Sequence, residues 1–287
     1  MSKQDPLVSI NIVAKSADFL NVSIRSALGQ TYTNVEIIVS DQTTTDDSAQ
    51  ICHQYPEVQY HRLPETKTDS SSEQRNIAYA IGISNGPFVL LLKESQVLHP
   101  FSVERLLEPL LEDDSIGLSF GMHRRIDESN QMRETCQTLR ATEPTKLRGD
   151  RILQQIIRGA QNLVGAANIV LIRKSIVSIT SGEIDFFGEK LCFDALLALC
   201  ILGAAQGNIF YIPQVLSYFR FKEELTEEMQ LHRWRQSIAG IFRSEVMTEQ
   251  ERYQAVKRYL KKCSSFKGSV EDIEWGQRML QQLSSSK

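Results

Sequence analysis

The sequence has few cysteines, and no two of them have the close spacing of a metal-binding pair. There are five, far apart along the chain: Cys52, Cys136, Cys192, Cys200 and Cys263. A disulfide framework uses an even set of cysteines, and a zinc site uses closely spaced pairs such as Cys-x-x-Cys, so the sequence predicts neither. We expect reduced thiols and a location in the reducing cytoplasm.

The sequence also lacks an excess of one charge and long apolar runs. The 287 residues carry a formal net charge of −3 with a pI near 6.0, which provides no basic surface for nucleic acid. The longest apolar stretch, 195–205, is too short to span a bilayer, and MSKQDPLVSI lacks the apolar region of a signal peptide. We therefore expect no nucleic acid partner, whereas peripheral contact with a membrane stays open.

The first part of the chain alternates short apolar runs with helical patterns. Strands are predicted over 8–13, 35–41, 58–63 and 87–92, and helices over 19–30, 46–55 and 71–84. Strands that alternate with helices in this way form a parallel sheet. The ligand crevice of such a sheet lies outside the carboxyl ends of the strands, so the residues just after each strand are candidates for chemistry.

The rest of the chain is less regular. The patterns predict an antiparallel strand pair over 116–127, a strand and basic turn over 162–175, a helix over 189–203 and a strand over 208–221. Beyond these, apolar residues at helical spacing predict amphipathic helices. We expect an α/β domain over 1–222 and a helical extension over 223–287, which packs on the domain or docks a protein partner.

Several ordered blocks resemble family 2 glycosyltransferases. They are PLVSINIVAKSADFLNVSIRSALGQTYTNVEIIVSDQTTTDDS, EQRNIAYAIGISNGPFVLLL, LHP, NLVGAANIVLIRKS and YIPQVLSYFRF, and together they lie within about residues 6–222. The resemblance implies the GT-A fold of nucleotide-diphospho-sugar transferases, with a mixed but mainly parallel sheet flanked by helices. It also implies a nucleotide-diphospho-sugar donor and an acceptor glycan, lipid or protein that receives the sugar by an inverting reaction.

The sequence departs from this family at the positions that carry chemistry. Where the family holds a divalent cation with Asp-x-Asp, this chain has Lys93, Glu94 and Ser95. Where the family has a late Arg-x-His, this chain has Arg220, Phe221 and Lys222. Because Mg²⁺ takes oxygen ligands and an ammonium group supplies none, we expect no metal cofactor.

Matching positions supply a candidate donor site, which consists of Asp41, Arg75, Lys93, Ser95 and Lys222. The resemblance implies that Asp41 accepts hydrogen bonds from the donor's base or ribose and that Arg75 lies beside the nucleotide. Lys93 and Lys222 would offset the charge of the diphosphate in place of a metal. As ordinary residues, Asp41 would cap a helix or a turn, Arg75 would form a surface salt bridge, and the two lysines would be solvated charges.

The candidate catalytic base is Asp194 or Glu189, which would deprotonate the acceptor hydroxyl. The family's Glu-Asp-x-Asp block aligns with 191–194, and its base position would fall on Cys192. Decay of an unused site explains the same replacements, so a catalytically inactive GT-A-like domain that binds an active glycosyltransferase is an alternative. A nucleotidyltransferase of related architecture is a third, although no glycine-rich phosphate loop follows the first strand.

Overall fold

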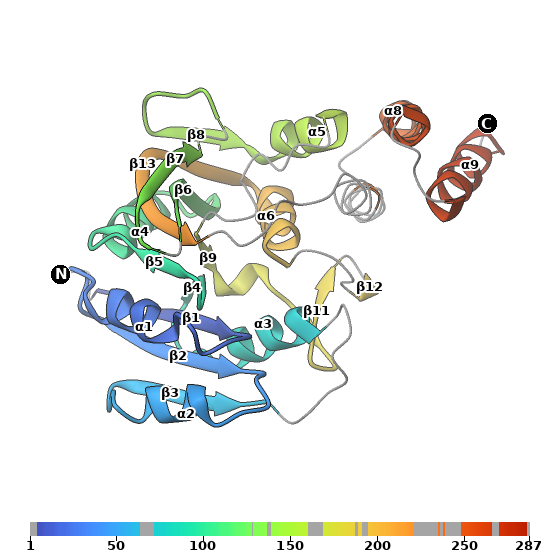
Figure 1. Cartoon of the computed structure of the whole chain (residues 1–287). Coiled ribbons are helices and arrows are strands. Elements are labelled where there is room, and N and C mark those ends of the chain that lie inside the picture. Colours follow the sequence, from blue (N-terminus) through green and yellow to red (C-terminus); the bar gives the residue numbers. More distant parts are fainter. Residues whose placement is uncertain are drawn as a thin grey trace.

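The structure is a computed structural model of an α/β protein, in which helices cover both faces of one large sheet (Figure 1). It describes residues 5–63, 72–127, 129–136, 139–159, 169–186, 189–190, 195–220, 235, 238, 248–265 and 270–285. Within these residues the large sheet has ten strands and a second sheet has three.

The first half of the large sheet is parallel. Its strands are β1 (Val8–Ala14), β2 (Val35–Asp41), β3 (Val58–Arg62) and β4 (Phe88–Lys93), in the order β3-β2-β1-β4. The helices that connect them are α1 (Leu20–Leu28), α2 (Asp47–Cys52) and α3 (Ser72–Ile83). Every residue of β1 is buried, as expected for a parallel strand covered by helices on both faces. The prediction from the sequence is confirmed for this half.

The second half of the sheet is mixed. Its strands are β5 (Gln96–Leu98), β6 (Ile116–Ile126), β7 (Met132–Cys136), β8 (Thr145–Arg148), β9 (Val170–Arg173) and β13 (Asn208–Arg220). β9 runs antiparallel to both β4 and β6, and β13 runs parallel to β6. β5 and β8 pair antiparallel with β13, and β7 pairs antiparallel with β6. The sheet order is therefore β3-β2-β1-β4-β9-β6-β13-β5.

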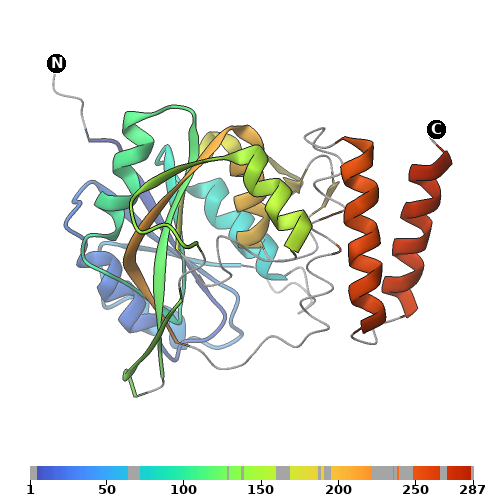
Figure 2. The same ribbon diagram turned by 90° about the horizontal axis from the view of Figure 1, so that it is seen from above.

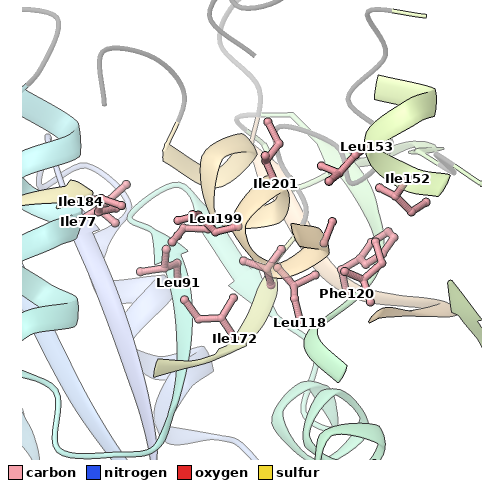
Figure 3. Close-up of a cluster of buried hydrophobic side chains, with 14 of the residues drawn as sticks. Ile77, Leu91, Leu118, Phe120, Ile152, Leu153, Ile172, Ile184, Leu199 and Ile201 are labelled. Atoms are coloured by element: carbon pink, nitrogen blue, oxygen red, sulfur yellow. The ribbon is translucent and has the colours of Figure 1, made fainter. Parts of the chain in front are cut away.

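Two hydrophobic clusters cover the two faces of the sheet. On one face, Ile10 and Ile12 of β1 lie in a cluster with residues of α1 and α4 (Ser102–Glu112). On the other face, strand residues pack against α3, α5 (Gly149–Gly159) and α6 (Ala195–Gln206). Figure 3 labels Ile77, Leu91, Leu118, Phe120, Ile152, Leu153, Ile172, Ile184, Leu199 and Ile201 of this second cluster. The alternation of side chains along each strand thus divides the core into two layers.

A small sheet lies beside α3. It consists of β10 (Ile179–Thr180), β11 (Glu183–Phe186) and β12 (Glu189–Lys190), all antiparallel, and it follows the short helix η1 (Lys174–Ile176) after β9. Ile184 of β11 is fully buried and lies beside Ile77 of α3 (Figure 3). This contact fixes the small sheet to the helix whose first turn reaches the candidate site.

The prediction of an antiparallel strand pair over 116–127 is wrong, because β6 is one continuous strand over Ile116–Ile126. Gly121 marks a close approach, since a Cβ atom there would lie 2.6 Å from Leu216 Cδ1 of β13. The prediction of a helix over 189–203 is wrong at its start. Glu189 pairs with Phe186 in β12, and the helix begins at Ala195.

Two C-terminal helices pack side by side at one end of the molecule (Figure 2). They are α8 (Glu249–Ser265) and α9 (Val270–Ser285). Tyr259 and Val256 of α8 are fully buried in the same cluster as Leu153 of α5, so α8 extends the core of the α/β domain. Trp275 of α9 lies edge-on to Tyr259, with 5.3 Å between ring centroids. None of the helices in the described part of the chain is long and apolar enough to cross a membrane.

Candidate functional site

The carboxyl ends of β2, β1 and β4 meet at one edge of the sheet. Ala14 is in register with Asp41 on one side, and Val13 is in register with Lys93 on the other. The main-chain amide of Glu94 still donates to the carbonyl oxygen of Val13, at 3.4 Å. The structure therefore brings Asp41 and Lys93 to the same edge, one strand to either side of β1, as the predicted topology requires.

Asp41 is fully buried, and both of its carboxylate oxygens have partners within the protein. The amide of Thr43 donates to Oδ1 at 2.8 Å, and the hydroxyl of Tyr60 donates to Oδ2 at 2.8 Å. Arg62 Nε lies 3.8 Å from Oδ2. Burial, and next the hydrogen bond to Asp41, raise the pKa of Tyr60 to about 12. Asp41 thus fixes the turn after β2.

Three charged side chains form a cluster where β1 and β4 end, which we call the Lys15–Glu73–Lys93 cluster. Glu73 is in the first turn of α3, Lys15 directly follows β1, and Lys93 ends β4. Glu73 Oε1 lies 2.9 Å from Lys93 Nζ, and Glu73 Oε2 lies 2.5 Å from Lys15 Nζ. The cluster joins three elements that are far apart in the sequence and carries one excess positive charge.

The charge state of Glu73 follows from these contacts. Burial by itself would raise the pKa of Glu73, but the ammonium groups of Lys93 and Lys15 outweigh it and lower that pKa to about 2. Glu73 is therefore ionised at neutral pH. Burial raises the pKa of the neighbouring Glu94, although Lys93 and Lys15 act in the opposite direction.

The turn between β4 and β5 contains Ser95 and is held from three sides. The Ser23 hydroxyl of α1 lies 2.6 Å from the carbonyl oxygen of Glu94 and 2.5 Å from that of Gln96, so it donates into the turn. The side-chain oxygen of Gln96 accepts a hydrogen bond from the Lys93 amide at 2.8 Å. The amide of Arg220, at the end of β13, donates to the Ser95 carbonyl at 3.1 Å. These contacts fix the direction in which β4 ends.

Arg220 places a buried guanidinium beside this turn. Only 2% of the residue is exposed, and its guanidinium carbon lies 4.0 Å from the centroid of the Phe19 ring. Its Nη2 donates to the side-chain oxygen of Asn130. Burial lowers the pKa of Arg220. Within the described ranges, Nε and Nη1 of Arg220 have no hydrogen-bond partner.

The other residues predicted for the site are placed less completely. Arg75 lies on α3, two residues after Glu73, and is half-buried. Glu189 lies on β12, in the small sheet beside α3. Asp194 and Lys222 lie outside the described residues, so their roles stay predictions.

Glu73 and Lys15 were missed as site residues by reasoning from the sequence. Lys15 was visible as an unusual residue directly after the first strand, and Glu73 as an acid two positions before Arg75. What the sequence did not show is that one carboxylate would bridge both lysines, because Lys15 and Glu73 are 58 positions apart.

The residues at the expected metal position do not fit a divalent cation. The resemblance places Lys93 and Ser95 there, and Lys93 presents an ammonium group that is already 2.9 Å from Glu73. Mg²⁺ in proteins takes carboxylates, water and phosphate oxygens, and a fixed ammonium repels it. Among the residues whose positions are described, no three His, Cys, Asp or Glu side chains are grouped to hold a metal.

Comparisons with known proteins give one family. Residues 9–178 match the family model described as "Glycosyl transferase family 2". The chain is similar to "Chondroitin synthase" of Escherichia coli, with 27% identity over 135 residues that cover 45% of this chain and 19% of that protein. It is also similar to "Glycosyltransferase GlyG" of Streptococcus pneumoniae serotype 4 (strain ATCC BAA-334 / TIGR4), with 24% identity over 128 residues, 43% of this chain and 41% of that protein. The matched region thus spans less than half of either relative.

Solved structures of S. aureus TarS have a similar fold. The complex of TarS residues 1–349 with UDP-GlcNAc has a TM-score of 0.64 and 14% identity, covering 96% of this chain and 80% of that one. The complex of the same fragment with UDP has a TM-score of 0.62 and 13% identity, covering 91% and 72%. At this identity the likeness concerns the fold alone, and the fold is GT-A, as the resemblance implied.

Proposed function

We propose, from the premise that this chain belongs to glycosyl transferase family 2, that it binds a nucleotide-diphospho-sugar and transfers the sugar to an acceptor hydroxyl. The acceptor would be a glycan, a lipid or a protein. The observation that carries the proposal is the Lys15–Glu73–Lys93 cluster, which sets positive charge at the carboxyl ends of β1 and β4. TarS, which shares the fold, has been solved with UDP-GlcNAc bound, and this supports a donor of the same chemical class.

The donor would bind without a divalent cation. A diphosphate brings roughly two negative charges into a partly dehydrated crevice, where unpaired charge costs several kcal/mol. Lys93 offsets part of this charge from the end of β4. Lys222, two residues after the end of β13, is the second cation in this proposal. Because ammonium groups and a metal would compete for the same position, they are alternatives at this site.

The chemistry of transfer would be an inverting displacement. The oxygen of the acceptor hydroxyl forms a bond to the anomeric carbon of the sugar, while the bond from that carbon to the diphosphate oxygen breaks. The hydroxyl proton passes to Asp194, or to Glu189 if that side chain faces the acceptor, as general base. The leaving nucleoside diphosphate gains negative charge, which Lys93 and Lys222 stabilise. The Ser23 hydroxyl, which contacts the carbonyl oxygens of Glu94 and Gln96, supports the turn that directly follows Lys93.

A transfer assay tests this function directly. The chain is incubated with a panel of UDP-, GDP-, CDP- and dTDP-sugars and a mixture of simple acceptor glycans in excess chelator, and NMR follows the anomeric signals. The proposal predicts a nucleoside diphosphate and a glycoside of inverted configuration. Binding of a nucleotide sugar without any turnover in the presence of chelator or metal would contradict transfer and favour a non-catalytic domain.

A further inference from the structure

The loop after β1 brings a second ammonium group to the candidate donor site. Lys15 directly follows the last residue of β1, and 46% of its side chain is exposed. Its Nζ lies 2.5 Å from Glu73 Oε2, the oxygen opposite the one that contacts Lys93. Two ammonium groups from different strand ends are therefore held at the two oxygens of a single carboxylate.

The cluster contains two ammonium groups and one carboxylate. Glu73 cancels one of the two positive charges of the cluster, and the carboxyl group of Glu94 also interacts with Lys93 and Lys15. The Lys15 ammonium group has three N–H donors, of which its contact with one carboxylate oxygen uses one. The two ammonium groups contact different oxygens of the same carboxylate, so they lie on either side of Glu73. Lysine is a competent ligand for phosphate groups, which it binds as a compact point charge.

An ordinary surface ion pair has a different composition. Lys146 Nζ lies 2.7 Å from Asp113 Oδ2, with 49% of the lysine side chain exposed, and that pair is electrically neutral. Pairs of this kind contribute little to stability. Glu73 instead binds two lysines and lies at the edge where β1 and β4 end. Lys146 is therefore a matched control for Lys15.

We infer that Lys15 is a diphosphate-binding residue and that Glu73 is the positioning residue that holds Lys15 beside Lys93. This inference rests on the proposed function, because it names the group of the donor that the Lys15–Glu73–Lys93 cluster recognises. The ligand class is a nucleoside diphosphate, free or linked to a sugar. Lys15 contacts neither the base nor the sugar of this ligand.

The test compares the affinities of Lys15→Met and Lys146→Met by calorimetry in excess chelator. The probes are UDP, GDP, CDP and dTDP, followed by the nucleoside of whichever diphosphate binds the unaltered chain most tightly. Lys15→Met should weaken binding of that diphosphate about tenfold or more, and binding of the nucleoside less than about threefold. Lys146→Met should change neither affinity. Lys15→Arg, which keeps the charge, should stay within about fivefold of the unaltered chain for the diphosphate.

The possible results separate this inference from the function on which it rests. If Lys15→Met and Lys146→Met bind the diphosphate with equal affinity, while Lys93→Met binds it more weakly, Lys15 does not bind the diphosphate. The proposed donor site would then be kept without Lys15. If Lys15→Met lowers the affinity for the nucleoside as much as the affinity for the diphosphate, Lys15 does not contact the diphosphate specifically. If the unaltered chain binds none of the four probes, both the inference and the proposed function fail. Circular dichroism of each variant checks that it is folded.

Discussion

The carboxylate of Glu73 lies 2.9 Å from the ammonium group of Lys93, and this contact ties the first turn of α3 to the end of β4. Lys15 contacts the other oxygen of the same carboxylate. The geometry makes Glu73 the centre of the site, although the family resemblance directs attention to Lys93. We therefore expect charge at this point to affect the stability of the fold and, under the proposed function, the binding of the donor diphosphate.

Glu73 should make stability depend on acidic pH. Its pKa is lowered from an ordinary 4.5 to about 2 in the folded chain. A carboxyl group of this kind stabilises the fold above pH 4.5, and its contribution is lost as the pH falls through about 2. We expect Glu73→Gln to cost about 1–2 kcal/mol at pH 7, since solvent screens the half-exposed lysines.

Urea denaturation of Glu73→Gln and of the unaltered chain at pH 7, 5, 4 and 3 measures this effect, provided that both unfold reversibly. The difference in the free energy of unfolding should shrink as the pH falls. Glu274→Gln is the control, because Glu274 pairs with Arg278 on the exposed side of α9 at 3.7 Å. A difference that stays constant over this pH range would show that the Lys15–Glu73–Lys93 cluster does not lower the pKa of Glu73.

Tyr259 should be essential to the stability of the whole domain. It is fully buried in α8, packs on Trp275 and belongs to the cluster that contains Leu153 of α5. Truncation of a large buried aromatic side chain costs about 3–5 kcal/mol. Tyr259→Ala should lower the stability of the whole chain by this amount, whereas Met132→Ala, at a residue that is 61% exposed, should change it little. Separate unfolding of the C-terminal helices in Tyr259→Ala, with an unchanged transition for the rest, would contradict a shared core.

Ser23 should couple α1 to the site. Its buried hydroxyl donates to the turn that contains Glu94 and Ser95. Ser23→Ala leaves buried carbonyl groups without this donor, so we expect a loss of about 1–3 kcal/mol in the free energy of unfolding. Thermal and chemical denaturation measure the loss, and Ser284→Ala on exposed α9 is the control. A loss no larger than that of the control would show that the hydroxyl does not hold the turn.

Introducing aspartates at the end of β4 should make diphosphate binding depend on a divalent metal. In the double variant Lys93→Asp with Ser95→Asp, two carboxylates replace the ammonium and hydroxyl groups, and Mg²⁺ binds such oxygen ligands with a diphosphate. Nucleoside diphosphate binding should then strengthen about tenfold or more on addition of Mg²⁺. Lys146→Asp, which replaces a lysine by an aspartate at the separate ion pair with Asp113, should show no such dependence. An equal response to Mg²⁺ in both variants would show that the effect comes from the altered net charge and not from a metal site at the end of β4.

The sequence predicts the parallel half of the fold well because its signals are local. Each of β1 to β4 is a short apolar run bounded by turn residues, and the order of such strands follows from their helical connections. The prediction failed over 116–127, where β6 pairs with β13, a strand about 90 residues later whose position no local pattern indicates.

Only part of the candidate site could likewise be predicted from the sequence. Asp41 and Lys93 end the two parallel strands that flank β1, so topology alone places them at one edge. Glu73 was not predictable, because nothing near it in the sequence shows that two distant lysines would converge on it. The internal partners of Asp41 were likewise hidden, since Tyr60 lies on the next strand.

The most direct test of the account is a calorimetric titration of the unaltered chain with UDP-, GDP-, CDP- and dTDP-sugars, each in excess chelator and again with Mg²⁺ or Mn²⁺. We predict saturable binding of at least one nucleotide sugar in chelator, with a Kd that changes less than about twofold when metal is added. Binding that requires metal, or that a chelator abolishes, would contradict the claim that ammonium groups stand where this family holds a cation.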